Sequence, residues 1–252
     1  MRSLKKEPFS LSVVMPVYNE EEIIEKVVRD FCDTILSRFQ KREFILVNDC
    51  SSDATALVLE RLKHEYPYIR LFINSSNQGH GPSLMRAYHE AKGEYIFHCD
   101  SDNQLVAEDF WSLWQSLRDN KLELVMGYRK QRKDPAYRIF MSNTLRLFII
   151  VFFGVPFRDI NAPFKLYAIS SLKKILSVVP RSAFVPTILM MLAAHAYRMR
   201  IGEVEIRHLP RITGKSFIRS WRAIVFCLRA GKELIRFIIQ IRNMRSPISL
   251  EI

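Results

Sequence analysis

The sequence predicts an α/β fold, in which a mostly parallel sheet carries helices on both faces and is followed by an amphipathic helical extension. Apolar segments of strand length alternate about four times with helical segments in the first half of the chain. The connections between these segments are short, and a basic segment with helical periodicity lies near the end of the sequence. We therefore expect a sheet domain over residues 1–216 and a basic amphipathic tail over residues 217–252.

The first half of the chain contains the expected alternation. Its strands are expected at 11–16, 44–47, 69–73, 94–99 and 122–127, and its helices at 20–39, 54–66, 83–92 and 106–119. Asn19 is the expected N-cap of the first helix, because its side chain can accept a hydrogen bond from the first turn. Leu57 and Leu62 are expected to face the core from the second helix.

The second half is less regular but contains elements of the same kinds. Helices are expected at 134–153, 170–179 and 183–197, strands at 164–169 and 201–208, loops at 157–163 and 210–216, and a final helix at 217–243. In that final helix Arg222, Arg229 and Arg236 recur every seven residues beside apolar positions. This pattern is typical of a helix that lies on an anionic bilayer.

The composition excludes several classes of protein. With 48% hydrophobic and 25% charged residues, the chain is globular rather than disordered. The four cysteines follow no C-x-x-C pattern, so neither a disulfide nor a zinc framework is expected. The longest apolar run, Leu147–Phe157, has 11 residues, whereas ~20 span a bilayer. Because no signal-peptide pattern is present either, we expect a cytoplasmic protein, peripheral on the cytoplasmic face of a membrane.

The net charge of +12 indicates anionic partners, which are phosphates, nucleic acid or acidic lipid. From Arg211 to Ile252, nine basic residues stand against two acidic ones. No DNA- or RNA-binding motif is present, so nucleic acid is not an expected partner. A membrane surface is expected, and a membrane-protein partner or a homo-oligomer stays open.

Acidic residues follow the strand expected at 94–99. This segment runs into Asp100-Ser101-Asp102, and Gln104 comes two residues later. Carboxylate and carboxamide oxygens can hold Mg²⁺ or Mn²⁺ and leave positions open for a phosphate-bearing ligand. The alternative is a simple turn, since Asp and Ser favour turns. The polar turns at 18–20 and 48–53 are expected at the same sheet edge, where such folds bind ligands.

Other residues near that edge suit a nucleotide. Asp49 and Asp53 are placed for a base or a ribose, with Glu20 beside them, although Asp53 is equally suited to cap the following helix. His80, between two glycines, is either a ligand contact or a bystander in its loop.

Basic residues near the same edge suit phosphate groups. Arg129 follows a strand, Arg138 begins a helix, and residues 211–216 form a basic loop. Arginine binds phosphate in a bidentate manner and lysine binds it as a point charge.

Seven motifs, in this order, resemble those of the family 2 glycosyltransferases, most closely the dolichyl- or polyprenyl-phosphate sugar transferases. They lie at 14–20, 47–55, 77–81, 100–104, 127–129, 159–165 and 211–216. The resemblance implies a GT-A (Rossmann-like) fold and a nucleotide-diphosphate sugar donor of the GDP-mannose or UDP-glucose type. It also implies transfer to a polyprenyl or dolichyl phosphate with inversion at the anomeric carbon.

The resemblance also assigns roles to individual residues. It implies a divalent metal, Mg²⁺ or Mn²⁺, at Asp100, Asp102 and Gln104, and acceptor-phosphate contacts from Arg129, Arg138 and Ser142. Catalytic roles fall on Asp102, Arg129, Arg138, Asp159, Arg211 and Lys215. Nucleotide-sugar contacts fall on Pro16, Tyr18, Glu20, Asn48, Asp49, Asp53, Gly79, Asp100 and Ser101. Asn48, Cys50 and Ala54 depart from the usual family residues, and this departure concerns base specificity more than the fold.

The acceptor decides whether a general base is needed. A phosphate monoester, with a second pKa near ~6, is ionised at neutral pH and needs no base. On this hypothesis Arg211 and Lys215 stabilise the leaving diphosphate, Arg129 and Arg138 hold the acceptor, and Asp159 positions the sugar or an arginine.

Two alternatives stay open at this point. A hydroxyl acceptor on a glycan or a protein would make Asp159 the leading candidate for the base. The other is a catalytically weak membrane-binding module. A dinucleotide oxidoreductase is disfavoured because no G-x-G-x-x-G follows the first strand.

Overall fold

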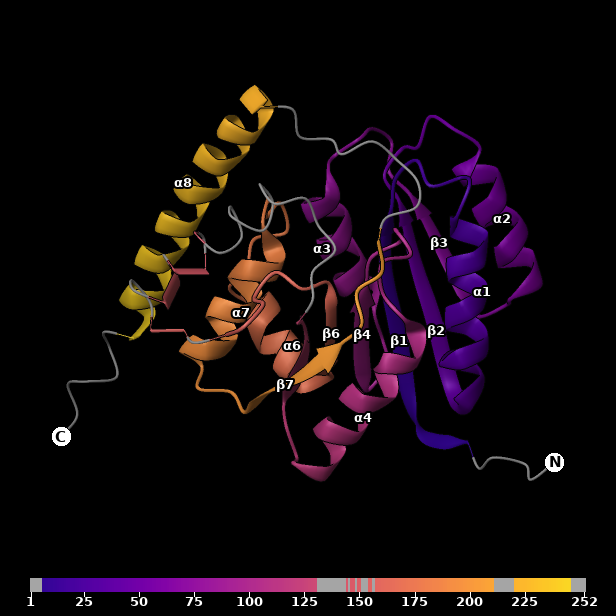
Figure 1. Ribbon diagram of the computed structural model, residues 1–252, viewed down its shortest axis with the longest axis horizontal. Coiled ribbons are helices and arrows are strands. Elements are labelled where there is room, and N and C mark those ends of the chain that lie inside the picture. The colour runs from indigo at the N-terminus through magenta and orange to yellow at the C-terminus, as the bar shows by residue number, and fades with distance from the viewer. Residues whose placement is uncertain are drawn as a thin grey trace.

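The protein is described by a computed structural model, which covers residues 6–130, 144, 146–147, 149–150, 154–155, 157–210 and 220–245 (Figure 1). Within these residues seven strands form one sheet, in the order β3-β2-β1-β4-β6-β5-β7. The strands are β1 (Glu7–Val17), β2 (Phe39–Asn48), β3 (Ile69–Ile73), β4 (Tyr95–Cys99), β5 (Leu124–Arg129), β6 (Phe164–Ala168) and β7 (Ile201–Ile206). The helices are α1 (Ile24–Thr34), α2 (Thr55–Glu65), α3 (His80–Glu90), α4 (Phe110–Asp119), α6 (Ile169–Leu176), α7 (Pro186–Ala196) and α8 (Ser220–Arg245), with short 3₁₀ turns η1 (Leu36–Arg38) and η2 (Ala107–Asp109).

The sheet is parallel except for one strand. β1 pairs in parallel with β2 and β4, β2 with β3, and β5 with β7, whereas β6 is antiparallel to both β4 and β5. The ends of β1, β2, β4, β5 and β7 and the start of β6 therefore lie at one edge, which we call the carboxyl edge. The strand order reverses beside β1, and this is where open α/β sheets bind ligands.

Helices cover both faces of the sheet, as the sequence predicts. α1, α2 and α4 bury Phe31, Leu59 and Leu113 against one face, and α3, α6 and α7 pack on the other. α8 lies beyond α7, at the end of the molecule away from α1 and α2 (Figure 1). The predicted α/β architecture with a C-terminal helix is confirmed.

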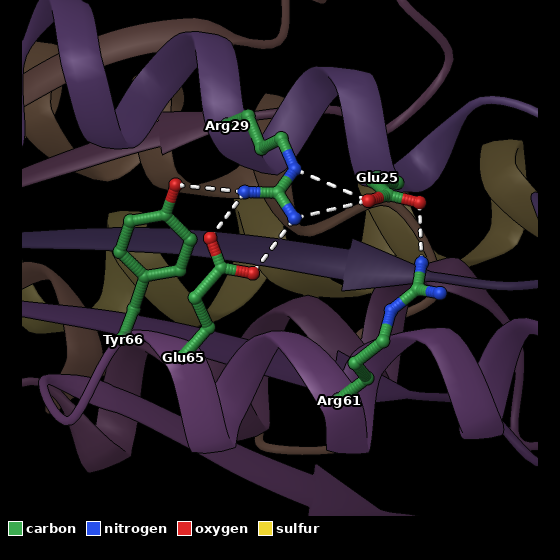
Figure 2. Close-up of polar contacts among 5 residues, drawn as sticks. All are labelled: Glu25, Arg29, Arg61, Glu65 and Tyr66. Carbon is green, nitrogen blue, oxygen red and sulfur yellow. Dashed lines mark hydrogen bonds and ion pairs between the residues drawn. The ribbon is translucent and has the colours of Figure 1, made fainter.

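An ion-pair network joins α1 to α2 on the outer surface (Figure 2). Arg29 donates from Nε to Glu25 (3.1 Å) and from Nη2 to Glu65 (2.7 Å), and its Nη1 also contacts Tyr66 Oη (3.2 Å). Arg61 of α2 reaches back to Glu25. The residues are partly or largely exposed, so the network links the two helices but contributes little stability.

α8 is joined to the rest of the protein by apolar and polar contacts. Ala230, Leu234 and Phe237 of α8 belong to the same buried cluster as α7. The Glu233 carboxylate accepts the backbone N–H groups of Phe184 (2.8 Å) and Val185 (2.9 Å), just before α7 begins. A negative charge is favourable there because the first N–H groups of a helix lack partners in the helix itself.

Four local predictions were wrong. α1 begins at Ile24 after the uncapped Ile23, because Asn19 adopts φ +51° and bonds a neighbouring loop instead of capping the helix. Leu57 is 76% exposed, and Leu59 faces the core in its place beside Leu62. α3 begins earlier than expected, since Gly79 with φ +93° makes the bend. Arg129 is the last residue of β5, whereas it was expected to follow the strand. The helix expected at 134–153 and the loop at 211–216 lie largely or wholly outside the described residues.

Candidate active site

The turns after β1 and β2 are joined by side-chain hydrogen bonds. Asn19 donates its N–H to Ser51 Oγ (3.0 Å), and its own Oδ1 accepts the Ser52 N–H (2.8 Å). Asp53 accepts the N–H groups of Thr55 (3.0 Å) and Glu21 (3.3 Å). Desolvation raises the pKa of Asp53, but these hydrogen bonds outweigh it and hold the pKa below its usual value. The two turns thus meet at the carboxyl edge, as the sequence predicts, and Asp53 helps to join them.

Asp49 fixes the loop that leads into α3. It is buried, and its carboxylate accepts the N–H groups of Gln78 (2.9 Å) and Gly79 (2.7 Å) and the Asn74 amide (2.7 Å). The next glycine, Gly81, permits a close approach, because a Cβ there would lie 2.3 Å from the Ala183 carbonyl oxygen. The backbone on either side of His80 is therefore fixed.

The Asp100–Gln104 turn follows β4 at the carboxyl edge. Ser101 and Gln104 are buried, whereas the Asp100 side chain keeps 26% of its surface exposed. Asp102 accepts the Gln104 N–H (3.2 Å). Gln104 in turn donates from Nε2 to the Leu209 carbonyl (3.3 Å) and accepts the Leu209 N–H on its backbone oxygen (2.8 Å), so the segment after β7 lies against this turn.

Two histidines approach the first carboxylate of the turn. His80 Nε2, at the start of α3, lies 3.0 Å from Asp100 Oδ1, and His98 Nε2 lies 3.5 Å from the same oxygen. Burial lowers the pKa of His98 to about 4. Although desolvation opposes it, the two histidines hold the pKa of Asp100 well below its usual range. The carboxylate is therefore ionised at neutral pH.

Arg129 and Asp159 form a buried, bidentate ion pair at the same edge. Arg129 donates from Nε to Asp159 Oδ2 (2.7 Å) and from Nη2 to Oδ1 (3.1 Å). Their side chains keep only 9% and 5% of their surfaces exposed. Both carboxylate oxygens of Asp159 therefore contact this guanidinium, and of the two roles predicted for Asp159 the geometry favours holding an arginine.

Lys165 is a buried lysine that sequence reasoning missed. It is fully buried in β6, pairs across the ladder with His98, and donates from Nζ to the Ala162 carbonyl oxygen. Burial lowers its pKa to about 7, although Asp159 opposes this shift. Cross-strand partners share a face of the sheet, so Lys165 and His98 lie on the same side of it.

The depressed pKa of Lys165 predicts a pH-dependent effect of Lys165→Met. Between pH 7 and about 10.4, Lys165 is protonated in the unfolded chain but has lost its proton in the folded chain. The free energy of unfolding of the wild type therefore rises with pH over this range. We expect the stability advantage of methionine to be greatest below pH 7 and to shrink by roughly 1 kcal/mol per pH unit above it. Urea unfolding at pH 6.5, 8 and 9.5 measures this, with the exposed Lys63→Met as control. A difference that does not vary with pH would contradict the assignment.

Not all predicted site residues can be placed. Arg138, Ser142, Arg211 and Lys215 lie outside the described residues, and their roles stay predictions. The described candidates lie in the segments that meet at the carboxyl edge. His98 and Lys165 were missed, although each carries a signal, since a titratable residue within a short apolar strand is unusual.

Comparison with known proteins gives one family. The sequence model of the protein family described as glycosyl transferase family 2 matches residues 12–176. A dodecaprenyl-phosphate galacturonate synthase of Rhizobium johnstonii is 29% identical over 220 residues, which cover 85% of this chain and 64% of that protein. An undecaprenyl-phosphate 4-deoxy-4-formamido-L-arabinose transferase of Proteus mirabilis is 28% identical over 207 residues, covering 82% and 62%. The chain thus spans less than two thirds of the length of these relatives.

Solved structures agree with the fold. Glucosyl-3-phosphoglycerate synthase from Mycobacterium tuberculosis, in complex with Mn²⁺ and UDP-glucose, aligns with a TM-score of 0.68 at 14% identity, covering 91% of this chain and 79% of that one. TarS from S. aureus in complex with UDP aligns with a TM-score of 0.57 at 20% identity, covering 77% and 57%. The expected GT-A fold is confirmed.

Proposed function

The chain belongs to glycosyl transferase family 2, and on that premise we propose that it moves a sugar from a nucleotide-diphosphate sugar to a polyprenyl phosphate, with inversion at the anomeric carbon. The observation that carries this proposal is the convergence at the carboxyl edge of the Asp100–Asp102 turn and the Arg129–Asp159 pair. The Asp100–Asp102 turn suits a diphosphate bound through a metal, and the Arg129–Asp159 pair suits an anionic acceptor. The names of the Rhizobium and Proteus relatives support a polyprenyl-phosphate acceptor.

Asp100, Asp102 and Gln104 are proposed to hold Mg²⁺ or Mn²⁺. The donor set fits such an ion, because two carboxylates one residue apart follow the end of β4, and a carboxamide lies two residues further on. When bound, the ion neutralises charge on the leaving diphosphate. The Mn²⁺ and UDP-glucose in the Mycobacterium structure support this choice.

The turns after β1 and β2 are proposed to hold the nucleotide. Pro16, Tyr18, Glu20, Asn48 and Ser101 lie in or beside strand ends at the carboxyl edge. Asp49 also acts through the loop that it fixes, because it sets the position of Gly79. The panel of nucleotide sugars proposed below tests which nucleotide base and which sugar the donor carries.

The acceptor side of the reaction is proposed to work without a general base. A phosphate monoester is ionised near neutral pH, so the protein has only to hold it in line with the anomeric carbon. Arg129 has the charge for this, and Asp159 fixes its guanidinium. A base would need an accessible carboxylate, whereas both oxygens of Asp159 face Arg129.

α8 is proposed to lie on an anionic membrane surface. Its outer side exposes Val225, Leu228, Ile235 and Ile239 together with Arg229, Lys232 and Arg236. Among the described residues, no helix combines the length and apolar character that crossing a bilayer requires. Replacing Lys232 and Arg236 by glutamate is expected to reduce flotation with phosphatidylglycerol vesicles several-fold, since each cation contributes about 1 kcal/mol near such a surface. Undiminished flotation would contradict this proposal.

The experiment for the donor is a panel of nucleotide sugars, GDP-mannose and UDP-glucose first, assayed with a short polyprenyl phosphate. We expect one donor to be used clearly better than the others, and transfer to stop with EDTA and return with Mg²⁺ or Mn²⁺. Transfer from these donors to simple sugars but not to the lipid phosphate would favour the hydroxyl-acceptor alternative.

A further inference from the structure

Three potential metal ligands cluster at the base of the Asp100–Asp102 turn. The ligand atoms of His80, His98 and Asp100 all lie within 4.8 Å of one another. The two imidazole Nε2 atoms lie 3.0 and 3.5 Å from the same oxygen, Asp100 Oδ1. Two ligand atoms that each lie ~2.1 Å from one ion are themselves roughly 3–3.5 Å apart. The distances of the two imidazole nitrogens from the Asp100 oxygen therefore match those between neighbouring ligands of a single ion.

His98 gives an independent reason to expect a ligand there. Its ring is fully buried, and within the described part of the structure neither ring nitrogen makes a geometrically good hydrogen bond, since Nε2 lies 3.5 Å from Asp100 Oδ1. Buried polar atoms are nearly always paired, because leaving one unpaired is costly. The edge-to-face contact with Tyr88, 5.6 Å between ring centroids, restricts the orientation of the imidazole while Nε2 lies near Asp100.

His80 is positioned by its backbone and is reachable from solvent. Asp49 binds the N–H of Gly79 directly before it, and the close packing of Gly81 fixes the residue directly after it. Its side chain nevertheless keeps 53% of its surface exposed. An ion can therefore reach Asp100 past His80 and find the buried His98 behind it.

We infer that His80 and His98 join Asp100 as nitrogen ligands, so that this site takes a divalent transition-metal ion of the Mn²⁺, Co²⁺ or Zn²⁺ class in preference to Mg²⁺. Imidazole suits transition metals, whereas Mg²⁺ favours carboxylate, carbonyl and water oxygens. The inference rests on the proposed function only for the role of the bound ion in the reaction. Metal binding itself requires neither the sugar donor nor the lipid acceptor.

Metal titration of the full chain, without nucleotide or lipid, tests the inference. Co²⁺ is the probe for nitrogen ligands, since its visible absorption reports the ligand set, and Mg²⁺ binding is measured by calorimetry. We expect His80→Gln to weaken Co²⁺ binding at least about 10-fold, because removing even a group that only hydrogen-bonds to a metal ligand lowers metal affinity by that much. Mg²⁺ binding should stay within about twofold of wild type, because the carboxylate ligands that Mg²⁺ favours are unchanged.

The matched control is His64→Gln, which removes an exposed histidine from α2 on the other face of the sheet. It should bind Co²⁺ as the wild type does. Wild-type affinity and absorption in His80→Gln would overturn the inference, and so would equal losses of Co²⁺ and Mg²⁺ binding. Failure of sugar transfer alone would leave these titrations unchanged, so the two proposals can fail separately.

Discussion

Asp102→Asn is expected to lower the rate of sugar transfer about 10²–10³-fold and to leave the fold intact. The substitution keeps the side-chain shape and an oxygen that can accept the Gln104 N–H, but it removes one negative ligand of the proposed ion. Losing one electrostatic contact to a charge that develops in the transition state typically costs this much. The measurement is kcat/KM together with the thermal midpoint of unfolding.

Asp119→Asn is the matched control for this variant. Asp119 is exposed at the end of α4, so the same change of charge there should affect neither transfer nor stability. More than a tenth of wild-type turnover in a folded Asp102→Asn protein would argue against a metal-held leaving group.

Breaking the Arg129–Asp159 pair is expected to have the second large effect. Asp159→Asn leaves a guanidinium buried without its charge partner, and Arg129→Gln leaves a buried carboxylate. Each single change should lower the free energy of unfolding by about 3–5 kcal/mol, whereas replacing both partners should cost much less than the sum. Denaturant unfolding of the two single variants and the double variant measures the coupling.

The same variants separate two roles of Asp159. If it positions Arg129, the double variant recovers stability but not transfer, because the acceptor still lacks its cation. The exposed pair Lys26–Asp30 of α1 provides the control cycle, with an expected coupling below about 1 kcal/mol. Additive losses at Arg129 and Asp159 would contradict a direct role of one in holding the other.

The sequence predicts the sheet well, because strand-length apolar segments alternate with helices and polar turns. It does not predict the direction of β6, since that strand follows a long segment and a strand of five residues carries no sign of its orientation. It also places Leu57 of α2 in the core, although that side chain is exposed, whereas Leu62 is buried as expected. Leu57, Val58, Leu59 and Leu62 lie on more than one side of the helix, so periodicity alone does not choose among them.

The site is predicted in part, for similar reasons. Asp100 and Asp102 are visible in the sequence because they end a strand in a polar turn. His98 and Asp100 are two residues apart, so any strand ending here places them on one side, but the pairing of His98 with Lys165 depends on β6, whose place in the sheet the sequence does not predict. The role of Asp159 likewise becomes visible only when the end of β5 and the start of β6 lie side by side.

The most direct test of the account compares two acceptors that differ by one phosphate group. A polyprenyl phosphate and the corresponding free polyprenol are offered to the protein with the best donor and Mn²⁺. The phosphate is already ionised at neutral pH, whereas the alcohol needs a general base to remove its proton. If the protein has no such base, we expect transfer to the phosphate and none above background to the alcohol. Comparable transfer to the alcohol would contradict the account and would require a base at the carboxyl edge.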